Sequence, residues 1–236
     1  MQDRVIMRSF RDLCKEAFPA DLTATVVSVQ GGEVQLSTTI GAEAVWSGGV
    51  LEFTSGPVIG LTAAIANNRS DTVICAGIKF TANCRPNVGD SVKLSAGPLK
   101  DARIYLDDPD SVKSDIDNNV NFFVTINSVE GDTSFKTLAG RTKAGEGRLD
   151  DFYGFEITVE TPYVTGTPSV ADVRRIHNEL PTLRDQIVSL IFNFVLNEEN
   201  RVQLLEKISW GRVLIRRPGT ANQNRGYVIE FDLGVL

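Results

Sequence analysis

Short segments of alternating apolar and polar residues dominate the sequence between residues 22 and 127. Glycine, proline, asparagine and serine clusters separate them, as in the QGGE turn that joins the first two. A period of two is that of a strand with one buried face, and many short strands with such turns predict an antiparallel β sandwich or barrel. The expected strands are 22–29, 34–39, 50–54, 58–66, 72–76, 91–95, 102–106 and 120–127.

Helical spacing is expected in two other parts of the chain. Residues 4–18 place apolar residues on one side up to Pro19, which predicts an amphipathic helix. This helix either packs on its own domain or forms an arm that docks on a neighbouring subunit. A longer helix is predicted after Ser169, whose hydroxyl suits an N-cap, and Pro181 is expected to break or restart it.

The predicted fold class is α+β, with an N-terminal β sandwich or barrel followed by a helix and a β-hairpin. The predicted domains are a helix or arm at 1–20, an antiparallel β domain at 21–163 and a helix-plus-hairpin region at 164–236. The polar segment 133–151 is expected to be a long mobile loop between strands. A further helical piece is predicted at 200–208, before the terminal hairpin.

Composition narrows the class of protein. With 42% hydrophobic and 23% charged residues the chain is typical of a globular protein, and its net charge of −6 argues against a surface that coats nucleic acid. No apolar run reaches the roughly 18 residues of a membrane helix, and the first ten residues do not resemble a signal peptide. Synthesis in a cytoplasm and no membrane span are therefore expected.

Three cysteines, Cys14, Cys75 and Cys84, are too few for a disulfide scaffold. A Cys75–Cys84 pair across a hairpin remains an alternative to burial as small apolar side chains.

The sequence lacks a set of residues for catalysis. Its one histidine, His177, is expected on a helix surface, and neither a Walker loop nor Gly-x-Ser-x-Gly occurs. Asp115, Asp117 and Asn119 have the first spacings of a calcium loop, but Val120 replaces its glycine, which favours an acidic turn. The doublets at 107–108 and 150–151 are typical of turns. We therefore expect neither an enzyme nor a cofactor.

Charge is distributed unevenly along the chain. Residues 101–160 carry six Lys/Arg against thirteen Asp/Glu, whereas residues 200–236 carry six against three. An acidic body with a basic tail suits self-assembly, although ordinary surface variation would also give it. The candidate contacts with a neighbouring subunit or with DNA in a channel are Arg141, Lys143, Arg148, Arg212, Arg216, Arg217 and Arg225. Trp46 and Trp210 are expected in the core.

One stretch carries a resemblance to a known class of protein. A strand that ends in Phe53-Thr-Ser-Gly56, then Gly60, and a corner at Pro86-x-x-Gly-Asp90 before Leu94 resemble a β module of tailed-bacteriophage tail and neck proteins. The C-terminal helix and hairpin look like those of tail-terminator subunits.

The resemblance implies a structural subunit of the virion. It would form a homo-oligomeric ring in the neck or tail-terminator region, or else in the tail tip or baseplate, contact other tail proteins and touch passing DNA transiently. The alternatives are a carbohydrate- or cell-surface-binding β module and, third, a hydrolase.

Overall fold

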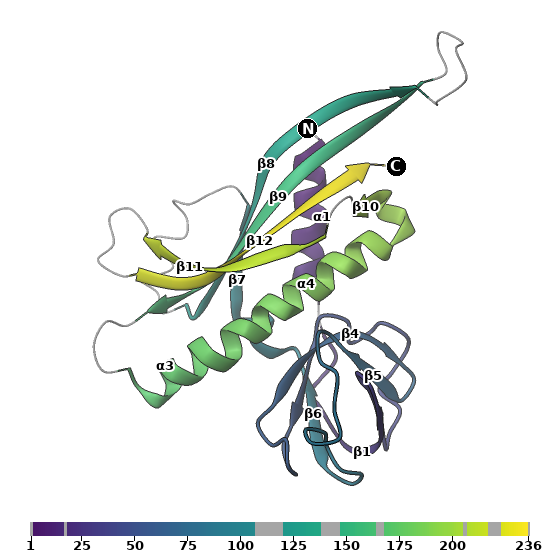
Figure 1. Ribbon diagram of the computed structural model, residues 1–236, viewed down its shortest axis with the longest axis vertical. Coiled ribbons are helices and arrows are strands. Elements are labelled where there is room, and N and C mark those ends of the chain that lie inside the picture. Colours follow the sequence, from purple (N-terminus) through teal and green to yellow (C-terminus); the bar gives the residue numbers. More distant parts are fainter. Residues whose placement is uncertain are drawn as a thin grey trace.

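The computed structural model (Figure 1) is a mixed α and β structure made of a closed barrel, a second sheet and a long helix between them. It describes residues 2–16, 18–106, 120–137, 147–163, 168–204, 207–216 and 223–235. Within these residues, no helix is long and apolar enough to cross a membrane.

Six antiparallel strands close the barrel, which confirms the β architecture predicted for the first part of the chain. Their order around the barrel is β1-β2-β5-β4-β3-β6. The bounds are β1 Leu22–Gln30, β2 Glu33–Leu36, β3 Val50–Phe53, β4 Thr62–Arg69, β5 Thr72–Cys75 and β6 Ser91–Ser95. The segment predicted at 58–66 is displaced, because a turn stabilised by Ile59 N–H to Gly56 O occupies its first residues. Alternate residues such as Val34, Phe53 and Val92 fill the barrel interior.

The two corners of the Phe-Thr-Ser-Gly and Pro-x-x-Gly-Asp stretch lie against each other in the barrel. Gly56 and Gly89 have φ of 81° and 90°, as the predicted turns require. Ser55 Oγ accepts a hydrogen bond from Ser91 N–H at 2.7 Å, and Asp90 Oδ2 accepts one from Asn87 N–H at 2.7 Å. The stretch is therefore a structural joint of the barrel.

The remaining strands form a separate sheet in the order β7-β8-β9-β12, with β10 and β11 both paired to β12. Their bounds are β7 Ala102–Leu106, β8 Phe122–Thr137, β9 Gly147–Tyr163, β10 Val202–Leu204, β11 Ser209–Arg216 and β12 Gln223–Val235. β7 is parallel to β8, and the other pairs are antiparallel.

These strands group differently from the predicted division at residue 163. β9 pairs with β12 along twelve residue pairs, from Tyr163↔Gln223 to Phe152↔Gly234, so segments on both sides of that boundary build one sheet. The helix predicted at 200–208 is wrong, since Val202–Leu204 pairs with the end of β12 as a strand. The predicted loop 133–151 is also wrong for its ends, because 133–137 and 147–151 are paired strands; residues 138–146 lie outside the described residues.

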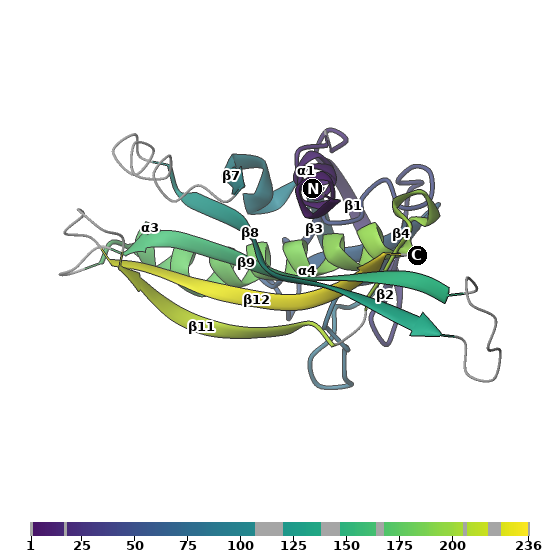
Figure 2. The ribbon, with the colours of Figure 1, turned by 90° about the horizontal axis from the view of Figure 1, so that it is seen from above.

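Helices cover one face of this sheet, as Figure 2 shows from above. The amphipathic N-terminal helix is confirmed as α1, Gln2–Cys14, and the long helix runs through α3 Val170–Arg174, η2 Arg175–Glu179 and α4 Leu180–Leu196. Short 3-10 turns occur at η1 Gly97–Asp101 and η3 Glu198–Asn200. The α1 helix packs on its own chain rather than projecting as an arm, since Phe10 meets Phe194 at 5.7 Å between ring centroids.

The α4 helix lies between the sheet and the barrel (Figure 1). Leu183, Ile187 and Ile191 belong to the core under the sheet. From the same helix, the buried Gln186 Nε2 donates to Gly48 O at 2.6 Å and Ala96 O at 2.8 Å in the barrel. A helix buried on two sides is apolar around most of its circumference, and the buried amide of Gln186 is satisfied by two barrel carbonyls.

All three cysteines are free. Cys14 and Cys75 are buried, while Cys84 is exposed, so the Cys75–Cys84 pair does not form. Burial raises the pKa of the Cys75 thiol to about 12 and that of Cys14 further still. Both buried thiols are therefore neutral core residues.

Candidate functional site

A groove of about 410 Å³ separates the start of the long helix from the C-terminal hairpin. Its apolar and aromatic walls come from Ile176, Leu180, Pro181, Val213, Leu214 and Tyr227. Its basic lining residues are Arg212, Arg225 and His177, and no carboxylate is among the described residues that line it. This volume lies within the range of about 300–1,000 Å³ typical of ligand sites.

The hairpin brings the two arginines into this groove. Arg212 is directly opposite Tyr227, and Leu214 is directly opposite Arg225, so all four share the helix-facing side of the sheet. Tyr227 is 3% exposed and belongs to the core, whereas Leu214 on the outer strand is 64% exposed. The groove thus begins where the cover of α4 over the sheet ends.

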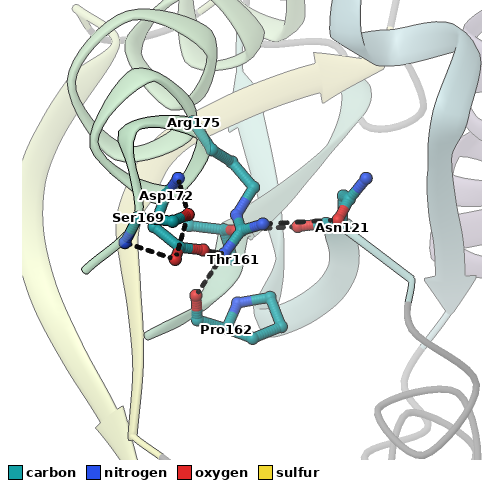
Figure 3. Close-up of polar contacts among 6 residues, drawn as sticks. All are labelled: Asn121, Thr161, Pro162, Ser169, Asp172 and Arg175. Carbon is teal, nitrogen blue, oxygen red and sulfur yellow. Dashed lines mark hydrogen bonds and ion pairs between the residues drawn. The ribbon is translucent and has the colours of Figure 1, made fainter. Parts of the chain in front are cut away.

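A polar anchor fixes the helix that forms the other wall (Figure 3). As predicted, Ser169 is the N-cap, and it forms a capping box with Asp172. Arg175 donates from Nη2 to Asp172 Oδ1 at 2.6 Å and to Pro162 O at 3.4 Å. Hydrogen bonds from Ser169 and the charge of Arg175 hold the pKa of Asp172 below its ordinary value. The anchor ties the helix start to the end of β9.

One π turn lets the helix pass Pro181 without ending. The N–H of Leu180 bonds to Arg175 O, five residues back, and α4 then starts with Pro181 in its first turn. Proline is tolerated there because it needs no N–H partner. The expected break at Pro181 does not occur, because the helix continues through a π turn into α4. The widened turn places Ile176 and His177 on the groove wall.

The guanidinium of Arg184 stacks on two aromatic rings at the edge of the groove. The guanidinium carbon of Arg184 lies 3.9 Å from the ring centroid of Trp210 and 4.8 Å from that of Tyr227. Asp185 accepts from Arg184 at 2.6 Å, and burial raises the pKa of this carboxyl despite the opposing charge of Arg184. Trp46 is buried as predicted, but Trp210 is 51% exposed, since it lies on the outermost strand.

A second feature is the ribbon formed by the outer ends of β8 and β9, residues 133–137 and 147–151. β7 accompanies β8 only at 122–126, and β12 accompanies β9 only to Phe152. Beyond these points the two strands pair only with each other among the described residues, from Thr133↔Asp151 to Thr137↔Gly147. Figure 1 shows this ribbon projecting past the sheet, at the end of the molecule opposite α3.

The structure brings together only some of the basic residues predicted as contacts. Arg212 and Arg225 meet in the groove, with His177 exposed on its wall. Arg216 pairs in register with Gln223 at the end of β11, and Arg148 pairs with Lys136 on the ribbon. The other three, Arg141, Lys143 and Arg217, lie outside the described residues.

The acidic candidates are separated from this groove. Asp150 and Asp151 are on β9 of the ribbon, whereas the doublet at 107–108 and the predicted calcium-like turn at 115–119 lie outside the described residues. Within the part of the chain that the structure describes, no group of three or more His, Cys, Asp or Glu is arranged to hold a metal ion.

Sequence reasoning missed the apolar half of the groove and its edge. Ile176 and Leu180 come from a different part of the chain than Leu214, and only the pairing of helix and hairpin makes them neighbours. Arg184 gave a usable signal, because it interrupts the apolar pattern of α4 beside buried Leu183. A charge at that position needs a partner, and Asp185 and Trp210 supply it.

No protein-family model matches the sequence, and no curated protein matches it.

Proposed function

We propose that this chain is a structural subunit of a tailed-bacteriophage virion that acts through assembly rather than catalysis. It forms part of a ring in the neck or tail-terminator region, or else in the tail tip or baseplate. The placement in a virion rests on the resemblance of Phe53–Gly56 and Pro86–Asp90 to a β module of tail and neck proteins.

The unsupported β8–β9 ribbon carries the proposal of assembly. Its residues 133–137 and 147–151 have partner strands only in each other among the described residues. An isolated two-stranded ribbon is marginally stable in water, and its free edges attract other strands. A ribbon of this kind is useful to a protein that inserts it into a neighbour, which favours a self-assembling subunit.

Oligomeric state is the direct test. The purified full-length chain is expected to give closed rings in negative-stain images and one discrete multimer by native mass spectrometry. Heterologous contacts of one kind around a closed ring predict a single copy number. A strict monomer at high concentration, which also binds no component of a tail lysate, would contradict the proposal.

Carbohydrate binding is the second candidate, and the exposed Trp210 is the observation that favours it. Sugars stack on exposed aromatic rings, but the Arg184 guanidinium lies 3.9 Å from this ring and covers one of its faces. A glycan array distinguishes the candidates. Binding that disappears in Trp210→Ala would promote this alternative over the ring subunit.

A further inference from the structure

The outer edge of β11 adjoins the groove at the C-terminal hairpin. Among the described residues β11 pairs only with β12, and Figure 2 shows it as the outermost strand on its side of the sheet. In an antiparallel pair, every second residue points its N–H and C=O away from the partner strand. The edge from Ser209 to Arg216 therefore offers backbone donors and acceptors to a further strand.

The exposed side chains of this edge are apolar and basic. Trp210, Arg212 and Leu214 lie on one side of β11, because side chains alternate along a strand. Trp210 is 51% exposed, Leu214 is 64% exposed, and Arg212 is exposed between them. Leu214 also lines the groove, so the apolar surface of the edge meets that of the groove. Exposed apolar surface of this kind marks interaction sites.

The groove can receive the side chains of an added strand. Leu180 and Tyr227, each 3% exposed, are among its buried lining residues. The guanidinium carbon of Arg212 lies 6.0 Å from the ring centroid of Tyr227, and Arg212 makes no ion pair among the described residues. No carboxylate is among the described lining residues either. An acidic occupant with an apolar side chain is therefore complementary to this surface.

The spacing on β11 defines which side chains such a strand would present. Arg212 and Leu214 are two residues apart and face the same side of the sheet. A strand paired with β11 has the same period, so it would place an acidic residue beside Arg212 and an apolar residue two positions away beside Leu214. The eight residues of β11 span about 26 Å at roughly 3.3 Å per residue, which is enough for a strand of about seven residues.

We infer that the edge of β11 and the adjoining groove form a docking site for an extended acidic segment of a partner protein. The segment adds to the sheet as a strand, and main-chain hydrogen bonds to β11 hold it. Arg212 binds its carboxylate, while Leu180 and Tyr227 contact its apolar side chain. This goes beyond the proposed ring function, because the occupant is a different polypeptide and a single copy of the chain carries the whole site.

A labelled peptide tests the site on the purified full-length chain. The probe is a heptapeptide with blocked ends, Thr-Glu-Thr-Leu-Thr-Glu-Thr, whose alternate residues are acidic or leucine. We expect saturable binding by fluorescence anisotropy. The version with lysine in place of both glutamates should bind about tenfold more weakly or worse, because it places like charges together. No saturable binding of the glutamate peptide up to about 1 mM overturns the inference.

Two substitutions on β11 test the protein side of the contact, each with a matched control. Arg212→Glu should weaken peptide binding about tenfold or more, whereas Arg103→Glu, at an exposed arginine on the opposite edge strand β7, should leave it unchanged. Leu214→Ser should weaken binding several-fold, whereas Val129→Ser, at a β8 side chain with the same 64% exposure, should not. Circular dichroism and melting temperature confirm that each variant is folded. Equal effects of a substitution and its control overturn the inference.

Backbone methylation distinguishes strand addition from a contact through side chains alone. One peptide carries an N-methyl group on its leucine, and a second carries it on the threonine that follows. The N–H groups of neighbouring residues in a strand point to opposite sides, so only one of the two methyl groups meets β11. We expect one peptide to lose binding and the other to retain it. Equal affinity of the two peptides overturns strand addition.

The ring function and this inference fail separately. Rings that do not bind the glutamate peptide overturn the docking site and leave the proposed function intact. A monomer that binds the peptide through Arg212 supports the docking site and overturns the ring. A duplex DNA oligonucleotide that binds in an Arg212-dependent way, while the peptide does not bind, assigns the groove to DNA and overturns the inference.

Discussion

At the scale of single residues, Gly56 shows how one missing side chain holds the barrel corners together. A Cβ at this position would collide with the carboxylate of Asp90, and the φ of 81° is in the left-handed region. A shift of the Asp90 carboxylate away from residue 56 would disturb the 2.7 Å hydrogen bond that its Oδ2 accepts from Asn87 N–H. Glycine is therefore required here both by conformation and by contact.

We predict that Gly56→Ala lowers the free energy of unfolding by at least about 1 kcal/mol more than Gly60→Ala. Gly60 has the same φ of 81°, but a Cβ there meets no atom within 4 Å, so it isolates the cost of backbone conformation. Urea denaturation of both variants measures the difference. Equal losses would show that the contact with Asp90 contributes nothing.

Gln186 is one of the residues of α4 that bond to the barrel. Besides its two donated bonds, its Oε1 accepts from Leu99 N–H at 3.3 Å, and the side chain is fully buried. We predict that Gln186→Ala lowers the free energy of unfolding by about 3 kcal/mol, since it strands buried backbone groups. Gln203→Ala, on an exposed position of β10, is the control and should change it by less than about 0.5 kcal/mol. Chemical denaturation checks both values, and similar small losses would refute this role.

At the scale of elements, the start of the long helix depends on the charge of Asp172. Its pKa is lowered chiefly by hydrogen bonds from Ser169, with a contribution from Arg175. A carboxyl with a depressed pKa in the folded state stabilises the fold above its unfolded pKa of about 3.9, and this contribution is lost as pH falls through the folded value.

Accordingly, Asp172→Asn should lower the melting temperature at pH 7, and its difference from the wild type should shrink below about pH 4. Thermal melts across this pH range measure the effect. Glu43→Gln, an exposed barrel carboxylate, serves as the control with no change at pH 7. A deficit for Asp172→Asn that stays constant down to pH 2 would exclude the charge as its cause.

At the scale of the whole molecule, the barrel is an insertion between α1 and β7. Its first and last strands pair directly, with Leu22 opposite Leu94, so the chain enters and leaves at one point. The barrel also has its own apolar core. The C-terminal region lacks this independence, since β12 pairs with β9 along most of its length.

We therefore predict that residues 20–96, expressed alone, fold into a β structure that unfolds cooperatively. Residues 164–236 alone should stay unfolded, because Tyr227 and Ile229 would lose the core that β9 and α1 complete. Far-UV circular dichroism and urea titration of both fragments provide the test. A folded C-terminal fragment would support the domain boundary predicted near residue 163.

Local features were predictable because each depends on residues close in sequence. The strands at 91–95 and 102–106, the Ser169 cap, the α1 helix and the terminal hairpin all follow from spacing or from a short side chain near a backbone amide. Of the candidate site, Arg212 and Arg225 were identified because they stand out as cations on an alternating hairpin.

Tertiary structure alone decided which strands share a sheet, and therefore where the groove and the ribbon lie. An alternating pattern indicates that one face of a strand is buried, but it does not indicate which strand it pairs with. The residues that pair between β9 and β12 are more than 50 positions apart in the sequence. For the same reason the sequence around Val202–Leu204 predicts a helix, whereas in the structure these residues pair with β12 as a strand. Pairing between segments far apart in the chain determines the fold, and the groove and the ribbon exist only because of that pairing.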